Sequence, residues 1–304
     1  MAAGGGSRAI VAALLANLGI AVAKFVGFLI TSSSSLLAES VHSVADSGNQ
    51  GLLLLGGRAA RKPATEERPF GHGRERYFWA FVVAVVLFAL GSLFSLFEGY
   101  GKLRESHEPE SLEVAVVILV LGLALEGYSF RTAIVEARPL KGERTWWTFI
   151  RHSRQPELPV VLLEDLGALI GLALALVGVV LAATVDPVFD AVATLAIGAL
   201  LGVIAAVLAI EMKSLLIGET AVPEVVSRIR AVLDAQPDVE RILHIRTVHI
   251  GPDELFVGCK IEMDATLAFD HVARRVNEIE ADIRAQVPEA AVLYLEPDTY
   301  RVDV

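Results

Sequence analysis

Residues 36–55 combine enough apolar side chains to enter a bilayer with four polar side chains at helical spacing. Glu39, His42, Asp46 and Asn49 are three, four and three residues apart, which puts them on one face of a helix. Because an ionisable group at the bilayer centre costs about 2.5–3.5 kcal/mol, such groups usually face a partner, a cavity or an ion. The imidazole of His42 and the carboxylate of Asp46, one turn apart, supply half of a site for a divalent transition metal.

Two adjacent carboxylates, Glu164 and Asp165, interrupt another apolar run at residues 158–183. Adjacent charges in so apolar a helix are hard to explain by packing alone. Asp46 lies twelve residues before the next basic residue, and Asp165 lies eleven residues after the preceding one. At ~1.5 Å per residue, both lie roughly 16–18 Å from the same basic boundary, so the two aspartates are predicted to meet at one depth.

These side chains form the core of a predicted metal site. His42, Asp46 and Asp165 would offer one nitrogen and up to four oxygen ligands. Because neighbouring residues of a helix point ~100° apart, Glu164 faces away from Asp165, and the identity of the fourth ligand stays open. Three further side chains could supply it: Glu164, Glu39 and Asn49. The alternative interpretation is a polar network that only holds the helices together.

Three other ionisable residues also interrupt apolar runs. Glu126 is expected to border the same cavity or a proton path, and Glu98 is expected at the outer interface of the membrane. Lys24 is expected either to neutralise one of these carboxylates or to extend its ammonium group to the lipid headgroups.

Six apolar runs predict six membrane-spanning helices, since each can cross ~30 Å of hydrocarbon. They cover residues 10–30, 36–58, 77–100, 112–130, 158–183 and 187–212. The chain has 304 residues, 54% of them hydrophobic, which is typical of a multi-span membrane protein. A single cysteine, Cys259, excludes a disulfide framework and a thiolate-rich metal cage. The net charge of −10 argues against nucleic acid as a partner.

Basic residues set the expected orientation. Six Lys or Arg lie from Arg58, at the end of the second run, to the start of the third run, and six follow the fourth run, whereas the links at the opposite ends carry none or two. The positive-inside rule therefore predicts that both termini lie in the cytoplasm. The first run is expected to be a retained span, not a signal peptide. The simplest expected location of the protein is the cytoplasmic (inner) membrane of a bacterium.

The chain changes character after its sixth apolar run. We expect a six-helix transmembrane transport domain over residues 1–217 and a cytoplasmic domain over residues 218–304. In the second domain, periodicity predicts helices at 223–235 and 271–287 and strands at 241–250, 255–263 and 291–295. The order α-β-β-α-β predicts a small α+β open-faced sandwich (ferredoxin-like) with both helices on one side of the sheet.

Three motifs carry a resemblance that covers nearly the whole chain: His42-x-x-x-Asp46 with Asn49, PFGHG at 69–73 and LLED at 162–165. With the six runs and the C-terminal sandwich, they resemble the cation diffusion facilitator family, most of all its branch related to the mitochondrial zinc transporter of animals. The resemblance implies that His42, Asp46 and the aspartate of LLED hold a transported divalent cation, with Zn²⁺ favoured, and that there is no prosthetic group. It also implies cation export from the cytoplasm in exchange for protons, by a homodimer embedded in membrane lipid.

Two departures from the family pattern bear on this expectation. Val161 stands four residues before Asp165, where many zinc-selective members carry a histidine. Glu164 could substitute, and an oxygen-rich site would widen the candidates to Mn²⁺, Fe²⁺ or Co²⁺. Lys260 and Tyr294 stand where members with a binuclear centre have histidines. We therefore expect a metal-poor C-terminal domain that acts mainly in dimerisation.

A transport-inactive membrane scaffold or metal sensor is the competing hypothesis, and the missing ligand at Val161 is its best support. An intramembrane hydrolase that uses His42 and Asp46 would lack a nucleophile with a plausible oxyanion site. The sequence therefore predicts no enzyme.

Overall fold

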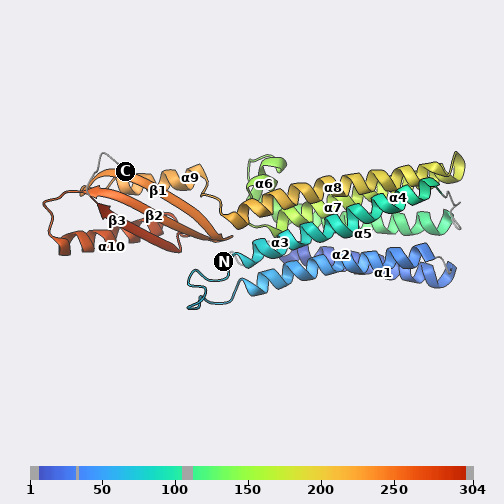
Figure 1. Ribbon diagram of the computed structural model, residues 1–304, viewed down its shortest axis with the longest axis horizontal. Helices are drawn as coiled ribbons and strands as arrows, with labels where there is room; N and C mark the ends of the chain where they lie inside the picture. Colours follow the sequence, from blue (N-terminus) through green and yellow to red (C-terminus); the bar gives the residue numbers. More distant parts are fainter. Residues whose placement is uncertain (1–6, 32–33, 105–111, 299–304) are drawn as a thin grey trace. The chain divides into compact units, whose positions relative to one another are not determined.

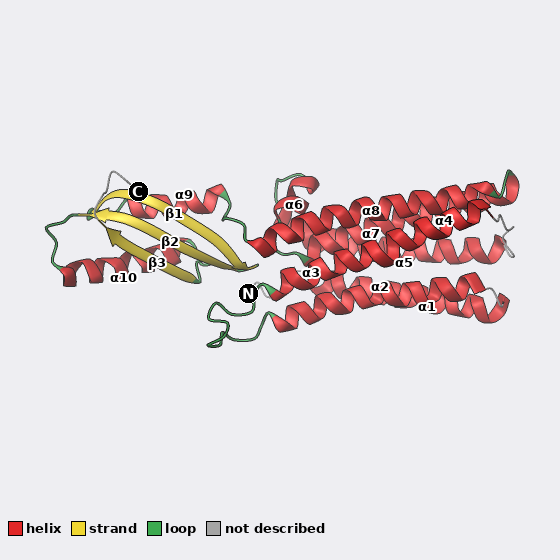
Figure 2. Cartoon of the chain, viewed as in Figure 1, coloured by secondary structure: helices red, strands yellow, loops and turns green. Residues whose placement is uncertain are grey.

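The computed structural model describes residues 7–31, 34–104 and 112–298, in which long helices precede a small α/β part (Figures 1 and 2). The helices of the first part are α1 (Ser7–Thr31), α2 (Ser34–Ala59), α3 (Glu75–Val86), η1 (Leu87–Leu93), α4 (Phe94–Arg104), α5 (Leu112–Lys141), α6 (Trp146–His152), α7 (Glu157–Thr184) and α8 (Val188–Ile217). The elements of the second part are α9 (Pro223–Asp234), β1 (Val239–Gly251), β2 (Glu254–Met263), α10 (Phe269–Gln286) and β3 (Val292–Asp298). The predicted order α-β-β-α-β is confirmed.

The chain forms two compact units. The helical unit comprises Met1–Ala59 and Glu75–Lys213, and the C-terminal unit comprises Ala60–Arg74 and Ser214–Val304. The segment between α2 and α3 thus belongs with the C-terminal unit, which the sequence does not reveal. The domain boundary between residues 217 and 218 stays a prediction.

Within the described residues, five helices are long and apolar enough to cross a membrane. They are the Arg8–Gly27 part of α1, the continuous rod of α3, η1 and α4, and helices α5, α7 and α8. The second predicted span, α2, is a helix of 26 residues, or ~39 Å, which is also long enough to cross. Its many polar residues set it apart from the five more apolar helices. The protein is therefore an integral membrane protein.

Two expectations for the segments between spans need correction. The fourth span was predicted to end at residue 130, but α5 continues to Lys141, because a helix can extend beyond the hydrocarbon once its side chains are polar. The basic segment after it contains the short helix α6, which the sequence analysis missed. Thr145 caps this helix by accepting a hydrogen bond from the backbone N–H of Thr148 at 3.1 Å.

Small residues allow the long helices to approach closely. α1 packs against α2 and α5, and α5 packs against α7. On α8, Gly198 and Gly202 form a G-x-x-x-G pair, a spacing typical of membrane-helix contacts. A Cβ atom at Gly198 would lie 2.9 Å from the backbone nitrogen of Leu96, and one at Gly202 would lie 2.8 Å from Ser92 Oγ. Ser92 donates a hydrogen bond to the carbonyl of Gly198 at 2.8 Å, so α8 fits tightly against η1 and α4.

The C-terminal unit is built on a three-stranded sheet (Figure 2). β1 pairs antiparallel with β2, and β2 pairs parallel with β3, so α10 forms the crossover between parallel strands. Alternate residues of β2 enter one apolar core, namely Leu255, Val257, Cys259, Ile261 and Met263. Both helices cover this core, α9 with Ile229 and Leu233 and α10 with Ile279 and Ile283. Because one face of β2 meets both helices, the predicted open-faced sandwich is confirmed.

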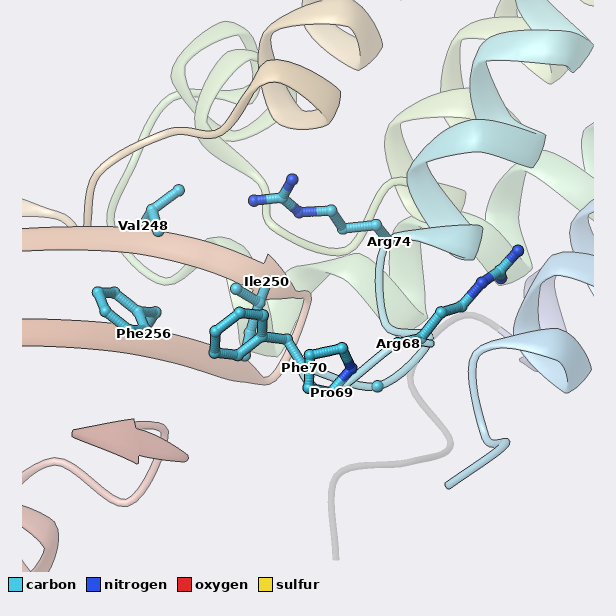
Figure 3. A pocket seen from close by; sticks show the side chains of 8 residues that line it. Arg68, Pro69, Phe70, Arg74, Val248, Ile250 and Phe256 are labelled. Atoms are coloured by element: carbon cyan, nitrogen blue, oxygen red, sulfur yellow. The ribbon is translucent and has the colours of Figure 1, made fainter. Parts of the chain in front are cut away.

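Residues 60–74 pack on the β1–β2 hairpin of the same unit. Phe70 meets Phe256 edge-on, with ring centroids 6.0 Å apart. A Cβ atom at Gly73 would lie 2.8 Å from the Cα of Gly251, so only glycine fits this approach. The segment and the hairpin line a pocket of about 480 Å³. Figure 3 shows the side chain of Arg74 extending toward Val248 in it. Residues 60–74 are therefore part of the packing of the C-terminal unit itself.

Candidate metal-transport site

Helix α2 carries the polar face that the sequence singles out. Its backbone is helical throughout, so Glu39, His42, Asp46 and Asn49 keep their shared-face spacing. The side chains of Glu39 and His42 lie outside the described part of the structure, and their place in the site stays a prediction. Asp46 is partly buried, and Asn49 is buried.

A buried carboxylate on α7 links that helix to α2. One oxygen of Glu164 accepts a hydrogen bond from Asn49 Nδ2 at 3.3 Å, and the other accepts one from Gln50 Nε2 at 2.9 Å. All three side chains are buried. The polar segments of α2 and α7 therefore meet at these residues.

These contacts define what Glu164 does in the described structure. Two amide donors hold both of its oxygens, so the side chain ties α7 to α2 and fixes the register between them. Each carboxylate oxygen keeps a further lone pair. Its role as the fourth metal ligand stays a prediction.

Asp165, the neighbour of Glu164, is directed to a third helix. Ser129 of α5 donates a hydrogen bond from Oγ to Asp165 Oδ2 at 2.7 Å. Ser129 is fully buried and Asp165 is 2% exposed. One oxygen of the aspartate is therefore held by the serine, and the structure gives the other no protein donor among the described residues.

Glu126 and Lys24 join the same region. Glu126 of α5 is 3% exposed, and its electrostatic neighbours are Asp165, Asp46 and Lys24. Lys24 of α1 donates a hydrogen bond to Ser43 Oγ of α2 at 3.2 Å. Four helices thus contribute charged groups to one buried region in the helical unit.

Several carboxylates gather in this region. Glu164 has Asp46, Asp165 and Glu126 as electrostatic neighbours, so four carboxylates influence one another. Among the described side chains, the amide oxygens of Asn49 and Gln50 are buried without a hydrogen-bond donor. No three described His, Cys, Asp or Glu side chains stand close enough together to hold a metal ion, and the side chain of His42 is not among them. Carboxylate and amide oxygens are of the ligand type that divalent cations such as Mn²⁺ accept.

Two of the buried contacts were missed by the sequence analysis. Gln50 follows Asn49 directly, and a second amide inside an apolar run was a signal that could have drawn attention to it. Ser129 lies three residues after Glu126 and so shares its face of the helix, but a serine in a membrane helix is too common to mark a site by itself.

The helical region matches a known family of proteins. Residues 10–217 match the model described as the cation efflux transmembrane domain. The chain belongs to the cation diffusion facilitator family. Residues 221–298 match the family's cytoplasmic domain, described as the cation efflux protein, cytoplasmic domain. The members of this family are transporters and not enzymes.

Named relatives include eukaryotic and bacterial proteins. The mitochondrial proton-coupled zinc antiporter SLC30A9 of Mus musculus is 30% identical over 270 residues, which are 84% of this chain and 47% of the relative. Metal tolerance protein C4 of Arabidopsis thaliana is 29% identical over 90% of this chain and 60% of its own length. The magnetosome protein MamB of Paramagnetospirillum magneticum is 24% identical over 91% of this chain and 89% of its own. The chain therefore spans about half the length of the first two relatives.

A second charged cluster of the helical unit is built differently from the buried one. Lys102 pairs with Glu98 at 3.4 Å and with Asp190 of α8 at 2.9 Å. Both carboxylates are partly exposed, at 39% and 30%. Here each acid has a lysine as its partner, so the cluster calls for no further cation.

Several acids of the C-terminal unit are also paired with basic residues. Lys260 of β2 binds Asp298 at 2.7 Å and Glu296 at 3.2 Å. These contacts, first of all the hydrogen bond to Asp298, raise the pKa of Lys260. Asp238 is held by Arg275 at 2.6 Å. Carboxylates that are neutralised in this way are poor candidates for metal ligands.

Proposed function

We propose that this cation diffusion facilitator exports a divalent metal cation, with Zn²⁺ favoured, in exchange for protons. The observation that carries the proposal is the buried set of carboxylates that α2, α5 and α7 bring together inside an apolar helical unit. Charged groups at such a position are rare outside ion and proton pathways. The zinc and proton named for the mitochondrial relative support the same choice of substrates.

The proposed mechanism uses one set of ligands for two substrates. Deprotonated His42, Asp46 and Asp165 bind the cation when the site is open to the cytoplasm. Protons compete for the same lone pairs when the site is open to the other side, since a metal ligand must be deprotonated. Metal release and proton uptake are thereby coupled through the same ligands, without a separate proton-binding site.

The choice of metal depends on the composition of the ligand set. Val161 is fully buried one helical turn before Asp165, so α7 offers a methyl-bearing side chain where a second imidazole would favour zinc. An oxygen-rich set favours Mn²⁺, Fe²⁺ or Co²⁺ relative to a set with two imidazoles. Preference for one of these metals is the alternative within the same family.

The C-terminal unit is proposed to hold two copies of the chain together in the cytoplasmic membrane of a bacterium, with both termini in the cytoplasm. The match of residues 221–298 to the family's cytoplasmic domain supports this role. The unit has its own apolar core and paired surface charges, so it can act as a rigid dimerisation module.

Metal-dependent proton flux in proteoliposomes tests the proposal. Wild-type protein is compared for Zn²⁺, Cd²⁺, Mn²⁺, Fe²⁺ and Co²⁺, with Asp46→Ala as the inactive control. The expected result is a saturable Zn²⁺ signal that disappears in the control. Proton flux with Mn²⁺ or Fe²⁺ alone would show that one of these metals, and not Zn²⁺, is the substrate. Metal binding without any flux would favour the transport-inactive scaffold or metal sensor that Val161 suggests.

A further inference from the structure

The C-terminal unit contains a pocket that neither its apolar core nor the proposed transport site uses. Its volume of about 480 Å³ lies within the range of small-molecule pockets, roughly 300–1,000 Å³. The residues that line it all belong to this unit, and they come from two segments, residues 68–74 and the β1–β2 hairpin. Small-molecule pockets are mostly apolar and carry a few polar groups that orient the ligand. The lining therefore indicates the class of ligand.

The apolar wall of the pocket lies on the face of the sheet opposite the core. Val248 of β1 pairs with Phe256 of β2. The residues on either side of Phe256, Leu255 and Val257, point into the core. Because successive side chains of a strand alternate between faces, Phe256 is turned away from that core. Phe70 is 48% exposed, and its ring meets that of Phe256 edge-on. This wall therefore offers aromatic surface to an apolar group of a ligand.

The ionisable residues that line the pocket are arginines. Arg74 extends into the pocket, whereas the guanidinium group of Arg68 points away from Phe256 (Figure 3). No residue in the described part of the chain makes a hydrogen bond or an ion pair with Arg74. The carboxylate of Glu254 lies beside Gly73 but is not part of the lining. Since a guanidinium group matches the geometry of a phosphate, the pocket suits an anion that also has an apolar part.

Chain connectivity brings this arginine to the surface of the bilayer. Arg74 is bonded to Glu75, the first residue of the rod of α3, η1 and α4, which ends at Arg104. The rod has 30 residues, or ~45 Å, and a bilayer with its headgroup regions is about 40–45 Å thick. Each end of such a rod reaches the level of the headgroups, so Arg74 is within reach of lipid phosphates.

We propose that this pocket binds an anionic phospholipid of the surrounding membrane. Arg74 contacts the lipid phosphate, and Phe70 and Phe256 contact the apolar part of the lipid. A ligand that binds only the folded state stabilises it, so the bound lipid strengthens the packing of residues 68–74 on the hairpin. The site goes beyond the proposed transport and does not depend on which cation is carried.

Photo-crosslinking locates the lipid on the full-length protein. The protein is reconstituted into phosphatidylcholine liposomes that contain phosphatidylglycerol with a photoactivatable acyl chain, and labelled peptides are identified by mass spectrometry. Arg74→Gln removes the charge at an exposed position, so the fold is retained. The matched control is Arg230→Gln, which removes the same charge from an exposed position of α9 outside the pocket.

The expected result is labelling of residues 68–74 and of the β1–β2 hairpin in the wild type. Labelling should fall by ~5-fold in Arg74→Gln, since one basic residue near an anionic membrane is worth about 1 kcal/mol, and should persist in Arg230→Gln. Equal labelling in Arg74→Gln, or none in the wild type, would overturn the assignment. Equal labelling by a photoactivatable phosphatidylcholine would overturn it too, since the pocket would then bind apolar chains alone. Loss of labelling in the presence of inorganic phosphate would assign the site to a soluble anion and not to a lipid.

Discussion

The buried cluster of the helical unit and the surface ion pairs of the C-terminal unit hold their acidic residues in opposite ways. In the C-terminal unit, Glu296 and Asp298 share Lys260, and Asp238 is held by Arg275. In the helical unit, carboxylates of three helices gather in one region, and Lys24 is a neighbour of opposite charge to Glu126. The first arrangement pairs each of these acids with a base, whereas the second brings several carboxylates and two buried amide oxygens without a described donor into one region.

This difference shows which unit is suited to handle a cation. Burying charged groups without compensation lowers stability, so a surplus of acids inside an apolar unit needs a functional reason. Neutralised acids at the surface of the C-terminal unit need none. The contrast also explains why acidic residues alone would have been a poor guide, since both units contain them.

The largest expected effect comes from removing a carboxylate of the buried cluster. Asp165→Asn keeps the hydrogen bond that Ser129 donates, because an amide oxygen can accept it, but removes the charge. We expect metal flux in proteoliposomes to fall by ~100-fold or more, beyond the cost of an outer-shell change. Glu98→Gln, in the cluster that Lys102 neutralises, is the matched control and should keep its flux. Equal loss in both variants would remove the distinction between the two kinds of cluster.

A smaller effect, on stability, is expected from the hydrogen bonds that join Glu164 of α7 to Asn49 and Gln50 of α2. Gln50→Ala leaves one oxygen of Glu164 without its 2.9 Å donor. A buried acceptor that loses its partner costs about 1–3 kcal/mol, so the thermal unfolding temperature of the detergent-solubilised protein should fall. Gln286→Ala, at an exposed position of α10, should leave it unchanged. If Gln50→Ala is as stable as the wild type, the hydrogen bond does not hold the helices together.

The smallest effect is expected in the C-terminal unit. Lys260→Gln removes the partner of Asp298 and Glu296 but should leave metal flux unchanged, because these acids lie outside the transport site. Since the folded pKa of Lys260 is raised, the stability that its charge contributes is present below the unfolded value near 10.5 and is lost as pH rises through the folded value. The difference in thermal stability between the variant and the wild type should therefore shrink above pH 10.5. A difference that grows with pH would contradict the ion pairs.

Much of the architecture follows from sequence patterns. Apolar runs predict the long helices, and period-two alternation predicts β2, because both depend on local spacing alone. The end of α5 escapes this reasoning because charged residues interrupt its apolar pattern, and α6, at seven residues, is too short to show a helical period.

The site is predictable only in part, for a related reason. Helical spacing puts Asp46 and Asn49 on one face, and residue counting gives Asp46 and Asp165 similar depths. Which side chains then meet depends on the rotation of each helix about its axis, and no pattern within one helix encodes that. The bonds from Gln50 to Glu164 and from Ser129 to Asp165 are of this kind.

Zinc-binding stoichiometry of the full-length protein tests the central claim most directly. Isothermal titration is carried out at fixed pH on the wild type, on Asp165→Asn and on Lys260→Gln. The account predicts one tight site per chain in the wild type, its loss in Asp165→Asn, and its retention in Lys260→Gln. Tight binding that survives Asp165→Asn would place the metal outside the buried carboxylates and contradict the account.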